Sequence, residues 1–294
     1  MVKNGLNSIW NLIRPANYIK NIFVFLPLFF SGRILDLSLL GNNILSFFSF
    51  CLVASSVYVF NDIVDREEDK IHPQNSNRPL ASGLISVRLA HLLDFVLCVS
   101  GFLIAWLTNI YLFYIVLGYK LLNIAYTLVL KKIAIIDVMV LSIGFVLRLY
   151  AGAVTTETSL SEWIIIMTYL LSLLIALGKR RNDVVFFEQQ DIVLRKSVNG
   201  YNSLFLNHAM VLLSSVIIVG YILYTVSDEI QARLHTTFLF TTVFWVIAAI
   251  LRYLQLIFVF KACDNPVKLF INDLPLKLIL LAWFINFYYF IYIH

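Results

Sequence analysis

The sequence predicts an all-α polytopic membrane protein with about nine transmembrane helices. Two observations lead to this fold class. Hydrophobic residues make up 61% of the chain and charged residues 13%, and the apolar residues form long runs with few charges. Runs of this kind are typical of membrane-spanning helices, whereas a β-barrel would show short alternating segments. The sequence therefore predicts a helical bundle in a membrane bilayer.

The nine expected spans follow one another along the chain and are separated by polar segments. The runs cover Tyr18–Leu35, Ile44–Asn61, Arg88–Leu107, Ile110–Leu130, Ile133–Val154, Glu162–Gly178, Ala209–Val226, Thr236–Gln255 and Leu274–Ile293.

Lysine and arginine are distributed unevenly between the segments that join these spans. With a cytoplasmic N-terminus, 18 of the 22 basic residues fall on the cytoplasmic side, Arg33 and Arg233 fall on the other side, and Lys120 and Arg148 lie inside helices. This asymmetry predicts the orientation of the chain in an inner (plasma) membrane. The net charge of +5 is thus a topology signal, and no nucleic-acid partner is expected.

An acidic stretch follows the second expected span and begins at Asn61 with the sequence NDIVDREEDK. On a helix, Asp62, Asp65 and Asp69 are spaced i, i+3 and i+7, so they share one face. Like charges on one face repel each other unless a cation lies between them. Mg²⁺, a hard cation that prefers oxygen ligands, is the expected partner, shared with a phosphate group. The alternative is a solvated helix end.

Two cations, Lys120 and Arg148, are expected inside the membrane, where a lone charge is costly. Each must face a partner or a wet cavity. Asp137 lies three turns before Arg148 on the same helix face, and Asp94 lies inside the third expected span. A structural pairing of the two cations with Asp94 is the alternative to a role in a site. Lys20, near the start of the first span, is either a site residue or a snorkelling anchor.

Several of these segments together resemble the UbiA superfamily of intramembrane prenyltransferases. NDIVDREEDK matches the NDxxDxxxD signature of that superfamily. Further segments resemble its polyprenyl-phosphate phosphoribosyltransferase branch: RPANYIKNIFVFLPLFF, IHPQNSNRPLASG, LNIAYTLVLKK, IIDVMVLSIGFVLRLYAGA, LGKRR, and the regions Arg252–Tyr253 and Asp273–Leu276. The resemblance covers the whole chain. It implies a single domain over residues 1–294 with its helices bundled around a cytoplasm-facing cavity.

The resemblance also implies a reaction, in which phosphoribosyl diphosphate (PRPP) donates 5-phosphoribose to a polyprenyl phosphate and diphosphate is released. Two positions depart from the family pattern. Where the family pattern has a second acidic motif, this chain has the basic residues Lys179, Arg180 and Arg181. They are followed by three irregularly spaced acidic residues, Asp183, Glu188 and Asp191. Asn75 replaces a lysine that is frequent in the branch.

A phosphoribosyl transfer brings several anions together and needs cations to hold them. The expected metal ligands are Asn61, Asp62, Asp65 and Asp69. The residues expected to act in catalysis are Asp62, Asp65, Lys120, Tyr126 and Asp137. The residues expected to bind substrates are Lys20, Asn21, Arg78, Lys120, Tyr126, Lys131, Arg148, Lys179, Arg180 and Arg181.

Two other functions remain open at this stage. One is transfer of a prenyl group from its diphosphate to an aromatic or other small acceptor. The other is transport, which the absence of an obvious pair of broken helices disfavours. The oligomeric state is not predicted.

Overall fold

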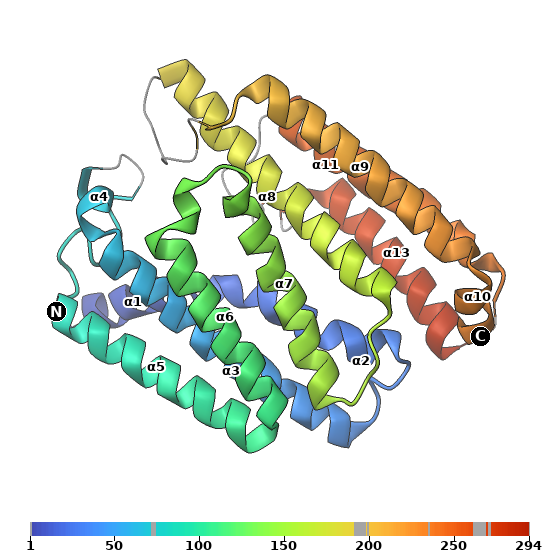
Figure 1. The fold of residues 1–294 in the computed structure, drawn as a ribbon, viewed down its shortest axis with the longest axis horizontal. Helices are drawn as coiled ribbons and strands as arrows, with labels where there is room; N and C mark the ends of the chain where they lie inside the picture. The colour runs from blue at the N-terminus through green and yellow to red at the C-terminus, as the bar shows by residue number, and fades with distance from the viewer. Residues whose placement is uncertain are drawn as a thin grey trace. The chain divides into compact units, whose positions relative to one another are not determined.

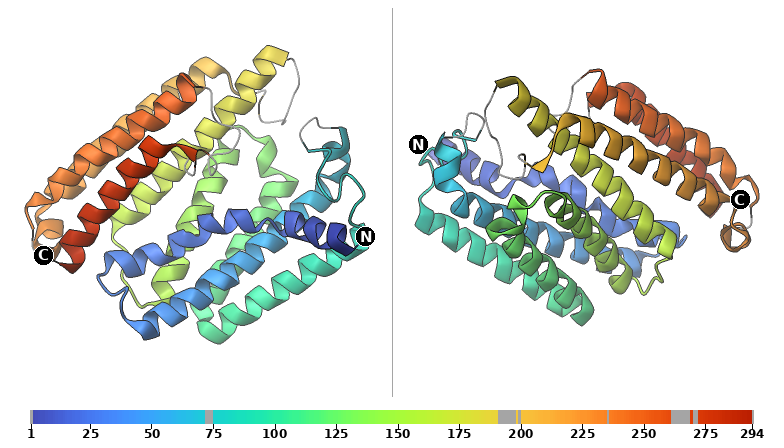
Figure 2. Two further views of the ribbon diagram at one scale, coloured as in Figure 1. Left: turned by 180° about the vertical axis from the view of Figure 1, so that it is seen from behind. Right: turned by 45° about the horizontal axis from the view of Figure 1, so that its top comes forward.

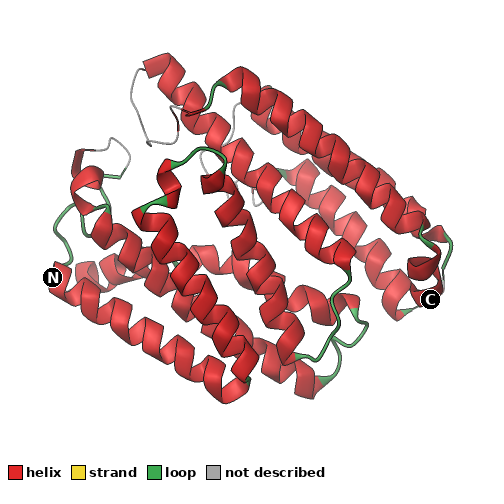
Figure 3. Cartoon of the chain, viewed as in Figure 1, coloured by secondary structure: helices red, strands yellow, loops and turns green. Residues whose placement is uncertain are grey.

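The computed structural model describes residues 2–71, 75–190, 198, 200–234, 236–260, 269 and 272–293, and these residues contain helices and loops but no strand (Figures 1 and 3). The chain divides into two compact units, residues 1–160 and 161–294. Each unit is described by itself below.

The described residues of the first unit form nine helical segments. They are α1 (Val2–Ile13), the 3₁₀ helix η1 (Pro15–Phe25), α2 (Leu26–Phe30), α3 (Leu37–Val64), α4 (Arg66–Ile71), α5 (Val87–Thr108), α6 (Ile110–Leu128), η2 (Leu130–Lys132) and α7 (Ile136–Thr155).

Helix α3 is the centre of this unit and packs against α1, η1, α5, α6 and α7. Asp36 caps its N-terminus: the carboxylate accepts hydrogen bonds from the backbone N–H groups of Ser38 and Leu39 at 3.0 and 3.3 Å. Such an N-cap satisfies donors that have no partner within the helix. With 28 residues, α3 is roughly 42 Å long. It is therefore long enough to cross a membrane and carry residues beyond it.

Small residues allow the helices of this unit to approach closely. Ser49 on α3 donates a hydrogen bond to the backbone oxygen of Gly101 on α5 at 2.9 Å. A Cβ atom added to Gly152 on α7 would overlap the backbone of Val24 in η1. Close backbone approach through small residues and interhelical hydrogen bonds is typical of helices that pack inside membranes.

The first expected span, Tyr18–Leu35, is built differently from the prediction. It begins as η1 and continues as α2, with no single long α-helix over these residues. Pro15 and Pro27 lack backbone N–H donors and stand at the starts of η1 and α2, where proline is tolerated. Because a 3₁₀ helix rises about 2 Å per residue, the two segments together still extend roughly 30 Å.

The second unit contains α8 (Glu162–Gln190), α9 (Ser203–Val226), α10 (Asp228–Leu234), the 3₁₀ helix η4 (Phe238–Thr242), α11 (Val243–Phe258) and α13 (Leu274–Tyr292). Helix α9 packs against α8 and α11, and α11 packs against α13 (Figure 2). Helix α8 continues twelve residues past Gly178, where the sequence predicts the end of the sixth span.

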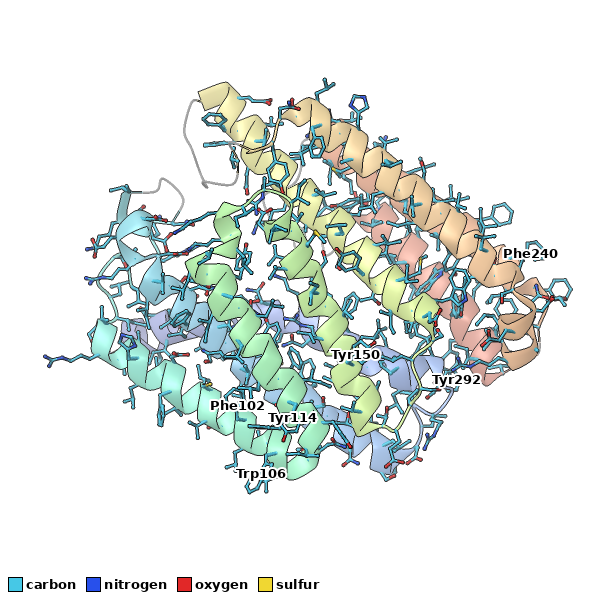
Figure 4. All side chains as sticks on the ribbon, in the orientation of Figure 1. Phe102, Trp106, Tyr114, Tyr150, Phe240 and Tyr292 are labelled. Atoms are coloured by element: carbon cyan, nitrogen blue, oxygen red, sulfur yellow. The ribbon has the colours of Figure 1, made fainter. Side chains whose placement is uncertain are left out.

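Eight helices in the described part of the chain are long and apolar enough to cross a membrane. They correspond to the second to ninth expected spans. Large aromatic side chains remain exposed on their surfaces, for example Trp106 on α5 and Tyr114 on α6 at 61% and 60% exposure (Figure 4). In a membrane protein such apolar surface faces lipid, so the all-helical multi-pass fold is confirmed.

Candidate active site

The acidic motif lies where α3 passes into α4. Asn61 and Asp62 are in the last turn of α3, Asp65 is the residue between the helices, and Asp69 is on α4. The backbone N–H of Asp65 donates to the carbonyl of Asn61, and that of Asp69 donates to the carbonyl of Asp65. These i to i−4 hydrogen bonds preserve the helical register across the junction, so the expected shared face is kept.

An apolar cluster brings three other parts of the first unit to this motif. It joins Leu12 of α1, Val59 of α3, Leu80 and Ile85 of the loop before α5, and Ala90 of α5. Asp62 follows Val59 by three residues, Arg14 follows Leu12 by two, and Arg78 precedes Leu80 by two. The packing of this cluster therefore places two arginines beside the first aspartate of the motif.

Asp62 is almost fully buried, with 1% of its surface exposed. One of its oxygens, Oδ1, accepts a hydrogen bond from Arg14 at 2.5 Å and another from Arg78 at 3.2 Å. The other oxygen, Oδ2, is buried and has no hydrogen-bond partner in the described structure. A buried carboxylate with one oxygen doubly paired and the other open is unusual, because buried polar atoms are normally satisfied.

Arg78 links Asp62 to Asp69. Its guanidinium donates to Oδ2 of Asp69 at 2.6 Å, and the amide of Asn75 donates to Oδ1 of the same carboxylate at 2.9 Å. Asn75, the departure from the family pattern, thus contacts the acidic motif directly with a neutral amide as the donor.

The remaining residues of the motif are held by the segment between α6 and α7. Lys131 in η2 forms an ion pair with Asp65, and Thr127 on α6 donates a hydrogen bond to the side chain of Asn61. Asp62, Asp65 and Asp69 therefore each have a cationic partner, drawn from Arg14, Arg78 and Lys131.

Lys120 on α6 is also buried, at 7% exposure. Its ammonium group donates to Asp94 on α5 at 2.9 Å and to Ser56 on α3 at 2.6 Å. The structural pairing that the sequence left open is therefore present for Lys120. This ion pair ties three helices together inside the membrane-spanning part of the unit.

Arg148 is also buried, at 4% exposure, but its hydrogen bonds go to neutral groups. It donates to the side chain of Asn21 at 2.7 Å, to the carbonyl of Gly144 at 2.6 Å and to the hydroxyl of Tyr119 at 3.0 Å. Its guanidinium also lies over the rings of Phe50, Tyr119 and Phe145, at 4.9 to 5.3 Å from their centroids. Aromatic faces stabilise a buried cation through their quadrupoles.

The other expected site residues of this unit occupy neighbouring helices. Tyr126 on α6 and Asp137 on α7 are buried, at 7% and 0% exposure, and Lys20 precedes Asn21 in η1. The carboxylate of Asp137 accepts a hydrogen bond from the backbone N–H of Val138 at 2.9 Å.

The basic motif Lys179–Arg181 belongs to α8 in the second unit. Arg180 pairs with Asp183 one turn further on, at 2.7 Å. Arg181 donates to the side chain of Asn207 at 2.6 Å and to the carbonyl of Ile257 at 3.0 Å. Glu188 accepts a hydrogen bond from the backbone of Ser203, and Asp191 lies outside the described residues.

The side chains of the acidic motif are suited to a divalent metal. Asn61, Asp62, Asp65 and Asp69 supply oxygen atoms within two helical turns, and hard cations prefer such ligands. The open Oδ2 of Asp62 is an acceptor that such a cation would satisfy. In the described residues no three acidic, histidine or cysteine side chains converge tightly enough to form a ready-made metal cage.

The sequence did not single out Arg14, which makes the shortest contact to Asp62. Its only local signal is its place directly before Pro15 at a helix break, in the segment RPANYIK. The partners Thr127 and Asn75 were likewise not predicted, since pairing across the bundle depends on packing between distant segments.

An all-helical membrane bundle whose acidic motif is interleaved with cations is the architecture of an intramembrane transferase. The chain belongs to the UbiA prenyltransferase family, whose model matches residues 23–185.

Named relatives and a solved structure agree with this assignment. A decaprenyl-phosphate phosphoribosyltransferase of Mycolicibacterium smegmatis is 31% identical over 96% of this chain and 91% of that protein. A protein of the same name from Mycobacterium tuberculosis is 30% identical over 95% of this chain and 93% of that protein. The structure of a UbiA homologue from Archaeoglobus fulgidus, bound to DMAPP and Mg²⁺, has a TM-score of 0.69 and 20% identity over 97% of this chain and 96% of that one.

Proposed function

We propose that this enzyme transfers 5-phosphoribose from PRPP to a polyprenyl phosphate in a Mg²⁺-dependent reaction that releases diphosphate. One observation carries the proposal: each aspartate of the acidic motif is matched by a cation, and a further buried cation, Arg148, has hydrogen bonds to neutral groups. A site that holds several phosphate groups needs basic side chains close to its metal ligands. The mycobacterial relatives, named as decaprenyl-phosphate phosphoribosyltransferases, support the same reaction.

The Mg²⁺ bound to the diphosphate of the donor would be coordinated by Asn61, Asp62, Asp65 and Asp69. A bound divalent metal neutralises the charge that develops on a leaving diphosphate. The A. fulgidus homologue with Mg²⁺ bound supports a metal in this fold.

The basic side chains position the two substrates. Arg78 and Lys131 lie beside the acidic motif and are suited to hold the diphosphate, while Lys20 and Arg148 lie along η1 and α7. Preorganised cations of this kind lower the barrier by orienting the reactants and by stabilising charge. In the second unit, Lys179, Arg180 and Arg181 are assigned to phosphate binding on the basis of their charge alone.

The reaction itself needs little proton transfer. The bond between C1 of ribose and the diphosphate oxygen breaks, and a bond forms between C1 and an oxygen of the polyprenyl phosphate. Because the attacking phosphate is already an oxyanion at neutral pH, no general base is required. We assign to Tyr126 and Asp137, which are buried on α6 and α7, the role of orienting the ribose. Lys120, paired with Asp94, is assigned to stabilising the negative charge in the site.

The distribution of lysine and arginine supports an inner-membrane location with the N-terminus and the active site in the cytoplasm. PRPP would then reach the site from the cytoplasm and the polyprenyl chain from the bilayer. We treat residues 1–294 as one catalytic domain.

The test is a transfer assay in membranes supplied with labelled PRPP and polyprenyl phosphate, with the lipids analysed by mass spectrometry. We expect polyprenyl-phosphoryl phosphoribose as the product, and its loss in Asp62→Ala and Asp65→Ala. Glu67→Gln is the matched control, because Glu67 belongs to the same stretch but is exposed and pairs with Lys70. Prenylated aromatic products in place of the phosphoribosyl lipid would show that the enzyme is a prenyltransferase for small acceptors. Full transfer by both aspartate variants would overturn the metal assignment.

A further inference from the structure

Arg14 and Arg78 converge on the same carboxylate oxygen of the acidic motif. Both donate to Oδ1 of Asp62, at 2.5 and 3.2 Å, and Arg78 reaches Asp69 as well. Their side chains keep 27% and 28% exposure, whereas that of Asp62 keeps 2%. The two arginines therefore lie between the buried carboxylate and the outside of the unit.

The ion pairs make the motif formally neutral. Three carboxylates, Asp62, Asp65 and Asp69, face three cations, Arg14, Arg78 and Lys131. A carboxylate that is already paired with a guanidinium attracts a second cation weakly, because the charges of the two cations oppose each other. A divalent metal that arrives alone must compete with the resident cations for the same carboxylates, although Oδ2 of Asp62 is open.

The backbone conformation of Arg14 helps to hold its guanidinium beside Asp62. The residue has a left-handed conformation, with φ 54° and ψ 58°, between α1 and η1. A residue other than glycine rarely adopts this region, and it persists where the surrounding structure enforces it. Here α1 packs against α3 and Pro15 follows directly. The guanidinium also lies 5.3 Å from the centroid of the Tyr58 ring.

A ligand that carries a diphosphate removes the competition between the metal and the arginines for the carboxylates. Its phosphate oxygens match the planar donor fork of arginine as well as a carboxylate does. When metal and diphosphate arrive together, the arginines can move from carboxylate to phosphate oxygens while the metal takes the carboxylates. The sum of charges in the site then stays close to balance at every stage.

We propose that Arg14 and Arg78 are resident counter-ions that make metal binding depend on diphosphate binding. The proposal rests on the metal role proposed above, and it adds Arg14 as a positioning residue that the sequence did not predict. By linkage, diphosphate raises the affinity for the metal by the same factor as the metal raises the affinity for diphosphate. Couplings of this kind are typically about 5-fold to 150-fold.

The experiment measures Mn²⁺ bound to the full-length protein in nanodiscs, with and without inorganic pyrophosphate, by equilibrium filtration. Empty nanodiscs at the same pyrophosphate concentration correct for Mn²⁺ held by pyrophosphate itself. For the wild-type protein we expect weak binding of Mn²⁺ alone and binding about tenfold tighter with pyrophosphate.

Variants of the two arginines separate the roles of charge and of structure. Arg14→Gln and Arg78→Gln should each tighten the binding of Mn²⁺ alone and reduce the effect of pyrophosphate to less than about threefold. Arg14→Lys retains the charge and should keep most of the coupling. Arg88→Gln is the matched control, because Arg88 is an exposed arginine of the same unit, and it should behave as the wild type does. If Arg14→Gln fails to fold, Arg14→Lys and Arg78→Gln still decide the outcome.

Two results would overturn the proposal, and they are distinguishable. If the wild type binds Mn²⁺ equally well with and without pyrophosphate and Asp62→Asn abolishes that binding, the metal site stands but the counter-ion role is wrong. If the wild type retains no Mn²⁺ under either condition, the metal role itself is wrong, and the coupling is wrong with it.

Discussion

The arginines of the two units are bound in different ways. In the first unit, Arg14 and Arg78 share one oxygen of Asp62 while the other oxygen of that carboxylate has no described partner. In the second unit, Arg180 and Arg252 each pair with their own aspartate, Asp183 and Asp273. A shared and incompletely satisfied acceptor can exchange its partners. The pair of Arg252 with Asp273 instead joins α11 to the start of α13, and the pair of Arg180 with Asp183 lies within α8. Charge alone, which is similar in the two regions, does not distinguish these roles.

A similar contrast separates Lys120 and Arg148, the buried cations of α6 and α7. Lys120 has a carboxylate partner, Asp94, and Arg148 has neutral partners and aromatic rings. A lysine is a compact, strongly hydrated charge, whereas the charge of a guanidinium is spread over a plane that stacks on aromatic rings. Arg148 can therefore remain charged without a carboxylate, and Lys120 is less suited to do so.

The largest expected effect comes from replacing the shared carboxylate. Asp62→Asn should lower the rate of phosphoribosyl transfer about 10²-fold to 10³-fold, the usual loss when one preorganised electrostatic contact at the reacting centre is removed. Asp273→Asn changes an aspartate that also has an arginine partner, but in the second unit, and should leave the rate within about threefold of the wild type. Initial rates at equal amounts of folded protein provide the measurement. Equal losses in both variants would contradict the distinction between the units.

The second prediction concerns the ion pair of Lys120. Lys120→Met leaves Asp94 without its cation and should destabilise the protein by roughly 2 kcal/mol, less than a fully buried pair would cost, because the side chain of Asp94 keeps 20% exposure. Adding Asp94→Asn should restore part of the lost stability. Thermal unfolding of the single and double variants in detergent gives the coupling between the two sites. Strictly additive losses would show that the pair contributes nothing to stability.

The third prediction tests the close packing of the second unit. A Cβ atom at Gly178 would overlap the hydroxyl of Tyr253 and the side chain of Ile257, and Tyr253 is buried. Gly178→Ala should therefore destabilise the protein by about 1–2 kcal/mol through overpacking. Gly118→Ala is the matched control, because a Cβ at Gly118 meets no atom within 4 Å. Unfolding midpoints of the two variants should differ, and identical midpoints would contradict the packing argument.

The smallest effect is expected at the start of α13. Asp273 caps this helix by accepting a hydrogen bond from the backbone N–H of Leu276, and its carboxylate pairs with Arg252 at 2.7 Å. The hydrogen bond from Arg252 lowers the pKa of Asp273 below its ordinary value. Asp273→Asn keeps a capping side chain but loses the charge, and should cost less than about 1 kcal/mol at pH 7.

The pH dependence of that small effect has a definite sign. A carboxylate whose pKa is lower in the folded protein stabilises the fold above its ordinary pKa, and the contribution is lost as the pH falls through the folded pKa. The difference between wild type and Asp273→Asn should therefore shrink below about pH 4. Unfolding midpoints at several pH values check this, and a difference that grows on acidification would be inconsistent with the pairing.

Hydropathy and helical spacing were sufficient for much of the fold and for part of the site. Eight of the nine expected spans are long helices, and Asp62, Asp65 and Asp69 keep the predicted helical register. The first span is a 3₁₀ helix followed by a short α-helix, which hydropathy cannot distinguish from a single α-helix because it depends on composition alone.

By itself, the sequence determined the helical membrane fold, the acidic motif and the family, since these depend on local spacing and composition. Only the tertiary structure decided which charges meet. It paired Lys120 with Asp94 and brought Arg14 to Asp62, residues that are 26 and 48 positions apart in the chain. Such pairings depend on how side chains of distant segments pack, here through the cluster around Leu12, Val59 and Leu80. Local sequence patterns therefore cannot predict these pairings.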